Sequence, residues 1–125
     1  MSKEFFSTNS VFPYAEFSQA IKVDHFVYVS GQIGDDLNGK LVDRTFKDEI
    51  KQVFENIKSI LQATGLDLKD IIKVTIFMSD MSLFNELNKI YITFFPQNQP
   101  TRSTVEVSRL HLNARVEIEV IAYKN

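Results

Sequence analysis

Two charged residues in the last quarter of the chain have the side-chain types for hydrolytic chemistry. Arg102 opens a predicted strand, and Glu117 lies in a second strand of the same predicted sheet. The planar guanidinium of an arginine can bind both oxygens of a carboxylate at once. A glutamate in a partly dry site can act as a general base for water. The pair suits hydrolysis of a small carboxylate-bearing molecule, although a structural ion pair between neighbouring strands explains the same spacing.

Three other places offer groups that a ligand could use. Ser30-Gly31 ends a predicted strand and presents a hydroxyl and open amides, but such a pair is also typical of a simple turn. Asn88 lies inside a predicted helix, where asparagine indicates either a specific hydrogen bond or a tolerated exposed residue. His25 and His111 lie in predicted turns and are interpreted as ordinary surface histidines.

The composition excludes several functions. The chain has no cysteine, and its two histidines form no H-x-x-x-H pair, so we expect no disulfide, thiolate nucleophile or metal site. The net charge of -2 and the lack of a basic run argue against nucleic-acid binding. Residues 1–10 do not resemble a secretory signal, and no apolar run approaches the roughly 20 residues of a membrane span. A cytoplasmic location is expected.

These residues must be positioned by a mixed sheet with helices on one face. The 125 residues suit one domain, residues 1–125. Thr45 is a predicted cap for a helix that Gly65 ends, and Asn38-Gly39 predicts a tight turn. Apolar spacing predicts an α/β (α+β) domain in which two helices cover the sheet. The predicted strands are 20–23, 26–30, 71–78, 102–107 and 116–123, and a second helix is predicted over 82–95.

The uncovered sheet face is predicted to be partly apolar, which is typical of an interface between subunits. In the strand 71–78, alternation places Ile72 with Val74, Ile76 and Met78 on the helix face. The other face is expected to carry Lys73, Phe77, Arg102, Thr104, Glu106, Glu117, Glu119, Ile121 and Tyr123.

Several ordered motifs resemble the RidA/YjgF family, whose members are described as enamine/imine deaminases and, under an older label, as L-PSP endoribonucleases. The resemblance runs from about Phe17 to Tyr123. Its motifs are Ser18-Gln19-Ala20-Ile21-Lys22-Val23, Val27-Tyr28-Val29-Ser30-Gly31-Gln32-Ile33, Gln52-Val53-Phe54-Glu55-Asn56-Ile57-Lys58, Val74-Thr75-Ile76-Phe77-Met78-Ser79-Asp80-Met81, Asn88-Lys89-Ile90-Tyr91, Pro100-Thr101-Arg102-Ser103-Thr104-Val105-Glu106-Val107 and Val116-Glu117-Ile118-Glu119-Val120-Ile121-Ala122.

The resemblance implies a chorismate-mutase-like fold and a homotrimer whose sheet faces form a central barrel, with active clefts between subunits. It also implies hydrolysis of 2-iminobutanoate- and 2-iminopropanoate-like imines and enamines to 2-keto acids and ammonia, without a cofactor. Arg102 resembles the carboxylate-binding arginine, and Glu117 resembles the acid that positions or activates water. The other expected substrate-binding residues are Ser30, Gly31, Phe17, Asn88 and Thr104.

One departure from the family pattern concerns Phe17, which stands where the family usually has a tyrosine. The missing hydroxyl predicts slower hydrolysis but leaves carboxylate binding by Arg102 intact. Tyr14, three residues earlier, is a possible source of a hydroxyl whose position the sequence does not give. Two alternatives therefore stay open: a non-catalytic keto-acid-binding or chaperone-like protein, and, disfavoured by the acidic pI of about 5.6, a ribonuclease or translation inhibitor.

Overall fold

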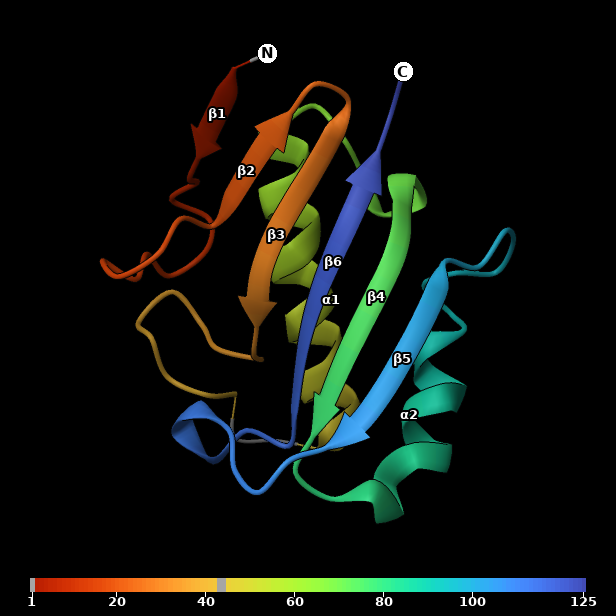
Figure 1. Ribbon diagram of the computed structural model, residues 1–125. Helices are drawn as coiled ribbons and strands as arrows, with labels where there is room; N and C mark the ends of the chain where they lie inside the picture. Colours follow the sequence, from red (N-terminus) through yellow and green to blue (C-terminus); the bar gives the residue numbers. More distant parts are fainter. Residues whose placement is uncertain (1, 43–44) are drawn as a thin grey trace.

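The computed structural model describes residues 2–42 and 45–125, and six strands form one mixed sheet at its centre (Figure 1). The strand order is β1-β2-β3-β6-β4-β5, with β4 and β5 parallel and the other neighbours antiparallel. In the described ranges, neither α-helix has the length and apolar character that a membrane crossing requires. The bounds are β1 (Lys3–Phe6), β2 (Ala20–Val23), β3 (Phe26–Gln32), α1 (Phe46–Ala63), β4 (Ile71–Met78), α2 (Phe84–Tyr91), β5 (Thr101–Glu106) and β6 (Val116–Tyr123), with short 3-10 turns η1 (Leu68–Asp70), η2 (Met81–Leu83) and η3 (His111–Asn113).

Helix α1 covers the back of the sheet in Figure 1 and supplies much of the core. It begins where predicted, because the Thr45 hydroxyl accepts a hydrogen bond from the Asp48 amide at 3.1 Å. It ends just before Gly65, which adopts a left-handed backbone with φ of +90°. Its apolar stripe, including Ile50 and Phe54, is fully buried. The predicted fold class, a mixed sheet with two helices on one face, is confirmed.

The second helix is shorter than predicted. The chain forms the 3-10 turn η2 before α2 begins at Phe84, and α2 ends at Tyr91 rather than near Phe95. After Ile90, the Thr93 hydroxyl and amide both donate to the Ile90 carbonyl, which closes a three-residue turn instead of a further α-helical turn. A short first strand, β1, was not predicted from the sequence at all.

Two predicted face assignments are wrong. The register of β4 against β6 shifts by one residue between Ile71 and Lys73, so Ile71 is buried and Ile72 is exposed. In β5, Arg102 and Thr104 pair in parallel register with Val74 and Ile76, which are buried on the helix face. Arg102, Thr104 and Glu106 therefore lie on the helix face and not on the open one.

A buried glutamate in the first turn of α1 holds the start of β6. The two carboxylate oxygens of Glu49 accept hydrogen bonds from Arg115, one from the amide at 2.8 Å and one from Nε at 2.6 Å. Glu49 is fully buried, whereas the Arg115 side chain is 38% exposed. A buried carboxylate of this kind must stay paired, because an unpaired one would lose its hydration without compensation.

We expect Glu49→Gln to lower the free energy of unfolding by about 1.5–3 kcal/mol, because one charge-assisted hydrogen bond is lost and a donor amide then faces Arg115. Urea denaturation followed by circular dichroism measures this change. Glu55→Gln, on the exposed side of α1, is the matched control and should stay within about 0.5 kcal/mol of the wild type. Equal midpoints for the two variants would contradict a structural role for the Glu49–Arg115 pair.

Candidate functional site

Arg102 lies half-buried between β5 and α2, where three α2 side chains surround its guanidinium. Its central carbon lies 4.7 Å from the centroid of the Tyr91 ring and 5.5 Å from that of the Phe84 ring. One terminal nitrogen donates a hydrogen bond to the Asn88 side-chain oxygen at 2.8 Å. The spacing of Phe84, Asn88 and Tyr91 places all three on one face of the helix. Asn88 thus makes a specific hydrogen bond, one of the two roles that the sequence left open.

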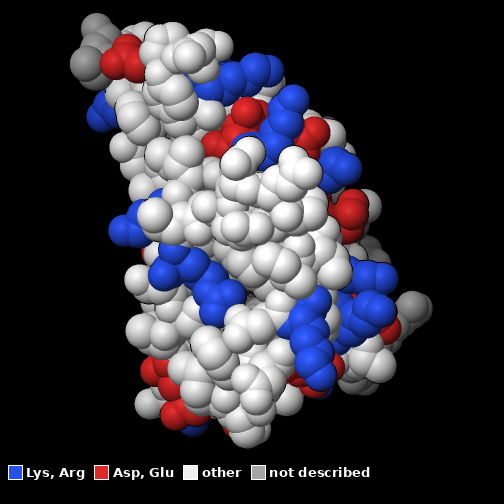
Figure 2. Space-filling view, turned by 90° about the vertical axis from the view of Figure 1, so that its right-hand side faces the viewer, with Lys and Arg blue, Asp and Glu red and all other residues white. Residues whose placement is uncertain are grey.

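This arrangement leaves most of the guanidinium donors available for a ligand. In the described part of the chain, the Arg102 guanidinium donates a hydrogen bond to Asn88. Its other N–H groups therefore remain for a planar anion such as a carboxylate. The Thr104 hydroxyl on the same face is buried without a hydrogen-bond partner in the described part of the chain. Figure 2 shows this side of the molecule, where basic side chains flank a broad uncharged area. The region around Arg102 is suited to holding a carboxylate.

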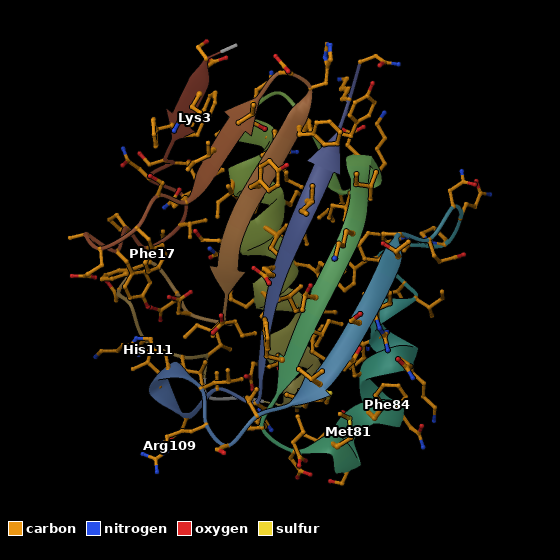
Figure 3. All side chains as sticks on the ribbon, viewed as in Figure 1. Lys3, Phe17, Met81, Phe84, Arg109 and His111 are labelled. Carbon is orange, nitrogen blue, oxygen red and sulfur yellow. The ribbon has the colours of Figure 1, made fainter. Side chains whose placement is uncertain are left out.

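A pocket of about 320 Å³ lies away from Arg102, beyond the end of β3. It is bordered by the end of β3, the loop after it, the segment before β2, and η3. In Figure 3, Phe17 and His111 mark this side, whereas Phe84 and Met81 mark the side of α2. The pocket lining includes Tyr14, Phe17, Gly31, Asp35, His111 and Glu117.

A bulge in β3 brings Gly31 against Glu117 in this pocket. Between Val29 and Gln32, β3 has one residue more than β6, so Ser30 and Gly31 leave the regular ladder. A Cβ atom at position 31 would collide with the Glu117 carboxylate, so a larger residue there would displace the Glu117 side chain. Burial, and next the neighbouring charge of Glu119, raise the pKa of Glu117. A carboxyl group with a raised pKa is a stronger base once ionised.

Tyr14 brings a hydroxyl group to the same pocket, but this hydroxyl donates its hydrogen bond to the carboxyl group of Asp35. Its ring stacks on Phe17 with the centroids 5.4 Å apart, and its hydroxyl donates to Asp35 Oδ2 at 2.8 Å. Asp35 also accepts from the Asn56 amide at 3.0 Å. Burial raises the pKa of Asp35, and burial together with the Asp35 hydrogen bond raises the pKa of Tyr14. The phenol therefore stays protonated.

The structure does not bring the two predicted catalytic residues together within one chain. Arg102 is on the helix face of the edge strand β5, whereas Glu117 is on the open face of β6, paired across from Phe77. The expectation that they share a face is wrong, because Arg102 pairs with Val74 of β4 and so faces the helices. The predicted residues form two groups: Arg102, Asn88 and Thr104 beside α2, and Phe17, Gly31 and Glu117 in the pocket.

Ser30 belongs to neither group through its hydroxyl. That hydroxyl donates to the Ser18 carbonyl at 2.6 Å, and the Ser30 amide donates to the Gln19 carbonyl at 3.0 Å. The sequence reasoning missed Phe84, whose spacing from Asn88 was a usable signal. It also missed Asp35, because loop residues carry no periodicity that aims them at a common point. His111 is exposed, as expected, and it also lines the pocket.

Comparison with known proteins gives consistent matches. Residues 7–124 match the family model described as Endoribonuclease L-PSP. The chain is 44% identical to a RutC family protein of Pyrococcus horikoshii, over 99% of both chains. It is 41% identical to a 2-iminobutanoate/2-iminopropanoate deaminase of Mus musculus, over 85% of this chain and 79% of that protein.

Solved structures agree with these matches. The crystal structure of yeast Mmf1 superposes with a TM-score of 0.95 at 40% identity, over 99% of this chain and all of the other. E. coli TdcF, solved with bound serine, gives a TM-score of 0.91 at 32% identity, over 98% of this chain and 99% of the other. Serine is a small carboxylate-bearing molecule.

Proposed function

Since the chain belongs to the RidA/YjgF family, we propose that it is a deaminase that hydrolyses small carboxylate-bearing imines, such as 2-iminobutanoate, to 2-keto acids and ammonia. The setting of Arg102 carries this proposal. Two aromatic rings and Asn88 fix its guanidinium while leaving donors for a substrate carboxylate. The deaminase names of relatives at about 41–42% identity support the same reaction.

The proposed site is assembled from two copies of the chain. Arg102, Asn88 and Thr104 come from one copy, and the pocket with Glu117 comes from the next. This follows from their positions on different faces and at different sides of the sheet. A contact that joins two different surfaces of identical chains repeats head to tail, and it forms a ring when the rotation between copies closes. The ring proposed here is a trimer, in which the exposed Phe26 and Tyr28 of the open sheet face become buried.

In the proposed reaction, Arg102 holds the carboxylate and Glu117 takes a proton from the attacking water. The raised pKa of Glu117 makes its carboxylate a better base. Phe17 lacks a hydroxyl, and the Tyr14 hydroxyl beside it is bonded to Asp35. The pocket can therefore place an apolar side chain of the substrate against these two rings.

The proposal is tested by generating 2-iminobutanoate in place with an amino-acid oxidase and following the release of 2-ketobutyrate. The wild type is expected to accelerate release well above the spontaneous rate. If the folded protein, checked by circular dichroism, does not accelerate the release of 2-ketobutyrate at any concentration, the proposed deaminase activity is refuted.

A second candidate function is a non-catalytic keto-acid-binding protein, which Phe17 favours because it removes a hydroxyl from the pocket without touching Arg102. Titration calorimetry with 2-ketobutyrate separates the two functions when it is run beside the release assay. Binding without turnover supports the binding protein, and binding with turnover supports the deaminase.

A further inference from the structure

His111 is a titratable residue of the pocket that the proposed reaction does not yet use. Its ring meets the Tyr14 ring edge to face, with the centroids 5.8 Å apart. It lines the same cavity as Glu117, and its charge acts on the carboxyl groups of both Glu117 and Asp35. Figure 3 shows His111 just below Phe17 on the pocket side of the molecule. His111 therefore shares a pocket with Glu117, the residue proposed to activate water.

An unusual backbone holds this histidine in position. Leu112 and Asn113, which follow it in η3, both have a left-handed φ of 57°. Non-glycine residues adopt this conformation at an energetic cost, which persists only where the surroundings enforce it. Two hydrogen bonds close the turn, from the Asn113 amide to the Leu110 carbonyl and from the Ala114 amide to the His111 carbonyl. Arg115, two residues after the turn, is bonded to Glu49, which ties the end of the turn to the start of β6.

The chemistry of imine hydrolysis needs a proton donor in addition to a base. When water attacks the imine carbon, the electron pair of the C=N bond moves to nitrogen, which must gain a proton. Phe17 has no proton to give, and the Tyr14 proton is directed to Asp35. Among the described residues that line the pocket, His111 is the one with a basic side chain, and imidazolium is a good acid near neutral pH.

We infer that His111 is a catalytic residue of the proposed deaminase and gives a proton to the substrate nitrogen while Glu117 takes one from water. This inference rests on the proposed function. The titratable groups that line the pocket around His111 are Tyr14, Glu16, Asp35 and Glu117.

The step balances without any further reagent. The water oxygen bonds to the imine carbon, Glu117 receives a water proton, and the nitrogen receives the His111 proton, which gives a neutral carbinolamine. The C–N bond then breaks. The hydroxyl proton passes to His111, the oxygen forms the C=O bond, and Glu117 returns its proton to the nitrogen, which leaves as ammonia. One imine and one water thus become one keto acid and one ammonia, and both residues regain their starting states.

The test compares His111→Gln with the wild type in the 2-ketobutyrate release assay. We expect kcat to fall about a hundredfold, at the lower end for general acid–base catalysis, with little change in KM. We also expect the fall in rate at alkaline pH, where imidazolium loses its proton, to disappear in the variant. Added imidazole should restore part of the rate to His111→Ala. The matched control is His25→Gln, in the β2–β3 turn, where His25 contacts Tyr123.

The possible failures are distinguishable. Unchanged kcat in His111→Gln, with activity lost in Arg102→Met, would overturn the role of His111 and keep the deaminase. A lower kcat with an unchanged pH profile and no rescue by imidazole would show a structural role and would also overturn the inference. Absence of turnover in the wild type would instead refute the proposed function.

Discussion

Arg102→Met is expected to lower kcat/KM for 2-iminobutanoate by about 10²–10⁴-fold. The substitution removes the two charge-assisted hydrogen bonds proposed for the substrate carboxylate, worth about 3–6 kcal/mol together. Methionine keeps an unbranched stem between the Phe84 and Tyr91 rings, so the packing of α2 on β5 should survive. The loss should appear in steady-state kinetics and as the absence of 2-ketobutyrate binding in calorimetry.

Two variants sharpen this result. Arg102→Lys retains the charge but not the planar fork, so its kcat/KM should lie between those of the wild type and Arg102→Met. Arg109→Met removes an exposed arginine of the loop after β5 and should leave kcat/KM unchanged. Wild-type kinetics in Arg102→Met would remove the observation on which the proposed function rests.

The second large effect is a recovery of activity when two inactive variants form mixed oligomers. Glu117→Gln keeps the shape of the side chain but cannot accept the water proton, so its kcat should fall about 10²–10⁴-fold. A copy carrying Glu117→Gln still offers an intact Arg102 group, and a copy carrying Arg102→Met still offers an intact pocket. In a head-to-tail trimer that contains both copies, one contact in three joins the two intact halves, so about a third of the wild-type kcat should return.

Co-expression with two different affinity tags and purification on both isolates these mixed oligomers. The control replaces the Glu117→Gln copy with the double variant Arg102→Met/Glu117→Gln, which leaves no intact Arg102 anywhere and should restore nothing. Doubly tagged oligomers that stay inactive with the single variants would show that the site is not shared between copies.

The sequence predicted the elements well where a hydrophobic pattern was strong. The bounds of β2, β4 and β6 and the start of α1 agree with the structure, because each has an aliphatic row or a capping threonine. The bulge at Ile72 was not predictable, because the run Ile71-Ile72 offers two equivalent apolar residues and only the pairing with β6 chooses between them. The end of α2 depended on the Thr93 hydroxyl, which competes locally for a carbonyl.

The site was predicted in its members but not in its arrangement. In the edge strand β5, residues of both faces are mostly polar, so no alternation shows which set faces the helices. Arg102 and Glu117 lie on opposite faces of the sheet, and only the pairing of Arg102 with Val74 of β4 shows this. The pocket joins Tyr14, Asp35 and His111 from three separate loops, and such proximity depends on the whole fold rather than on any local spacing.

The buried Glu49 has a consequence for how this scaffold can diversify. Its carboxylate anchors Arg115, at the foot of the His111 loop, and its backbone packs against Gly34, where a Cβ atom would clash, at the foot of the loop after β3. Both loops that line the pocket are thus held at their bases by the first turn of α1. Substitutions at the tips of these loops can change which substrates the pocket accepts with little loss of stability. Substitutions at their bases are expected to destabilise the fold and to be removed by selection.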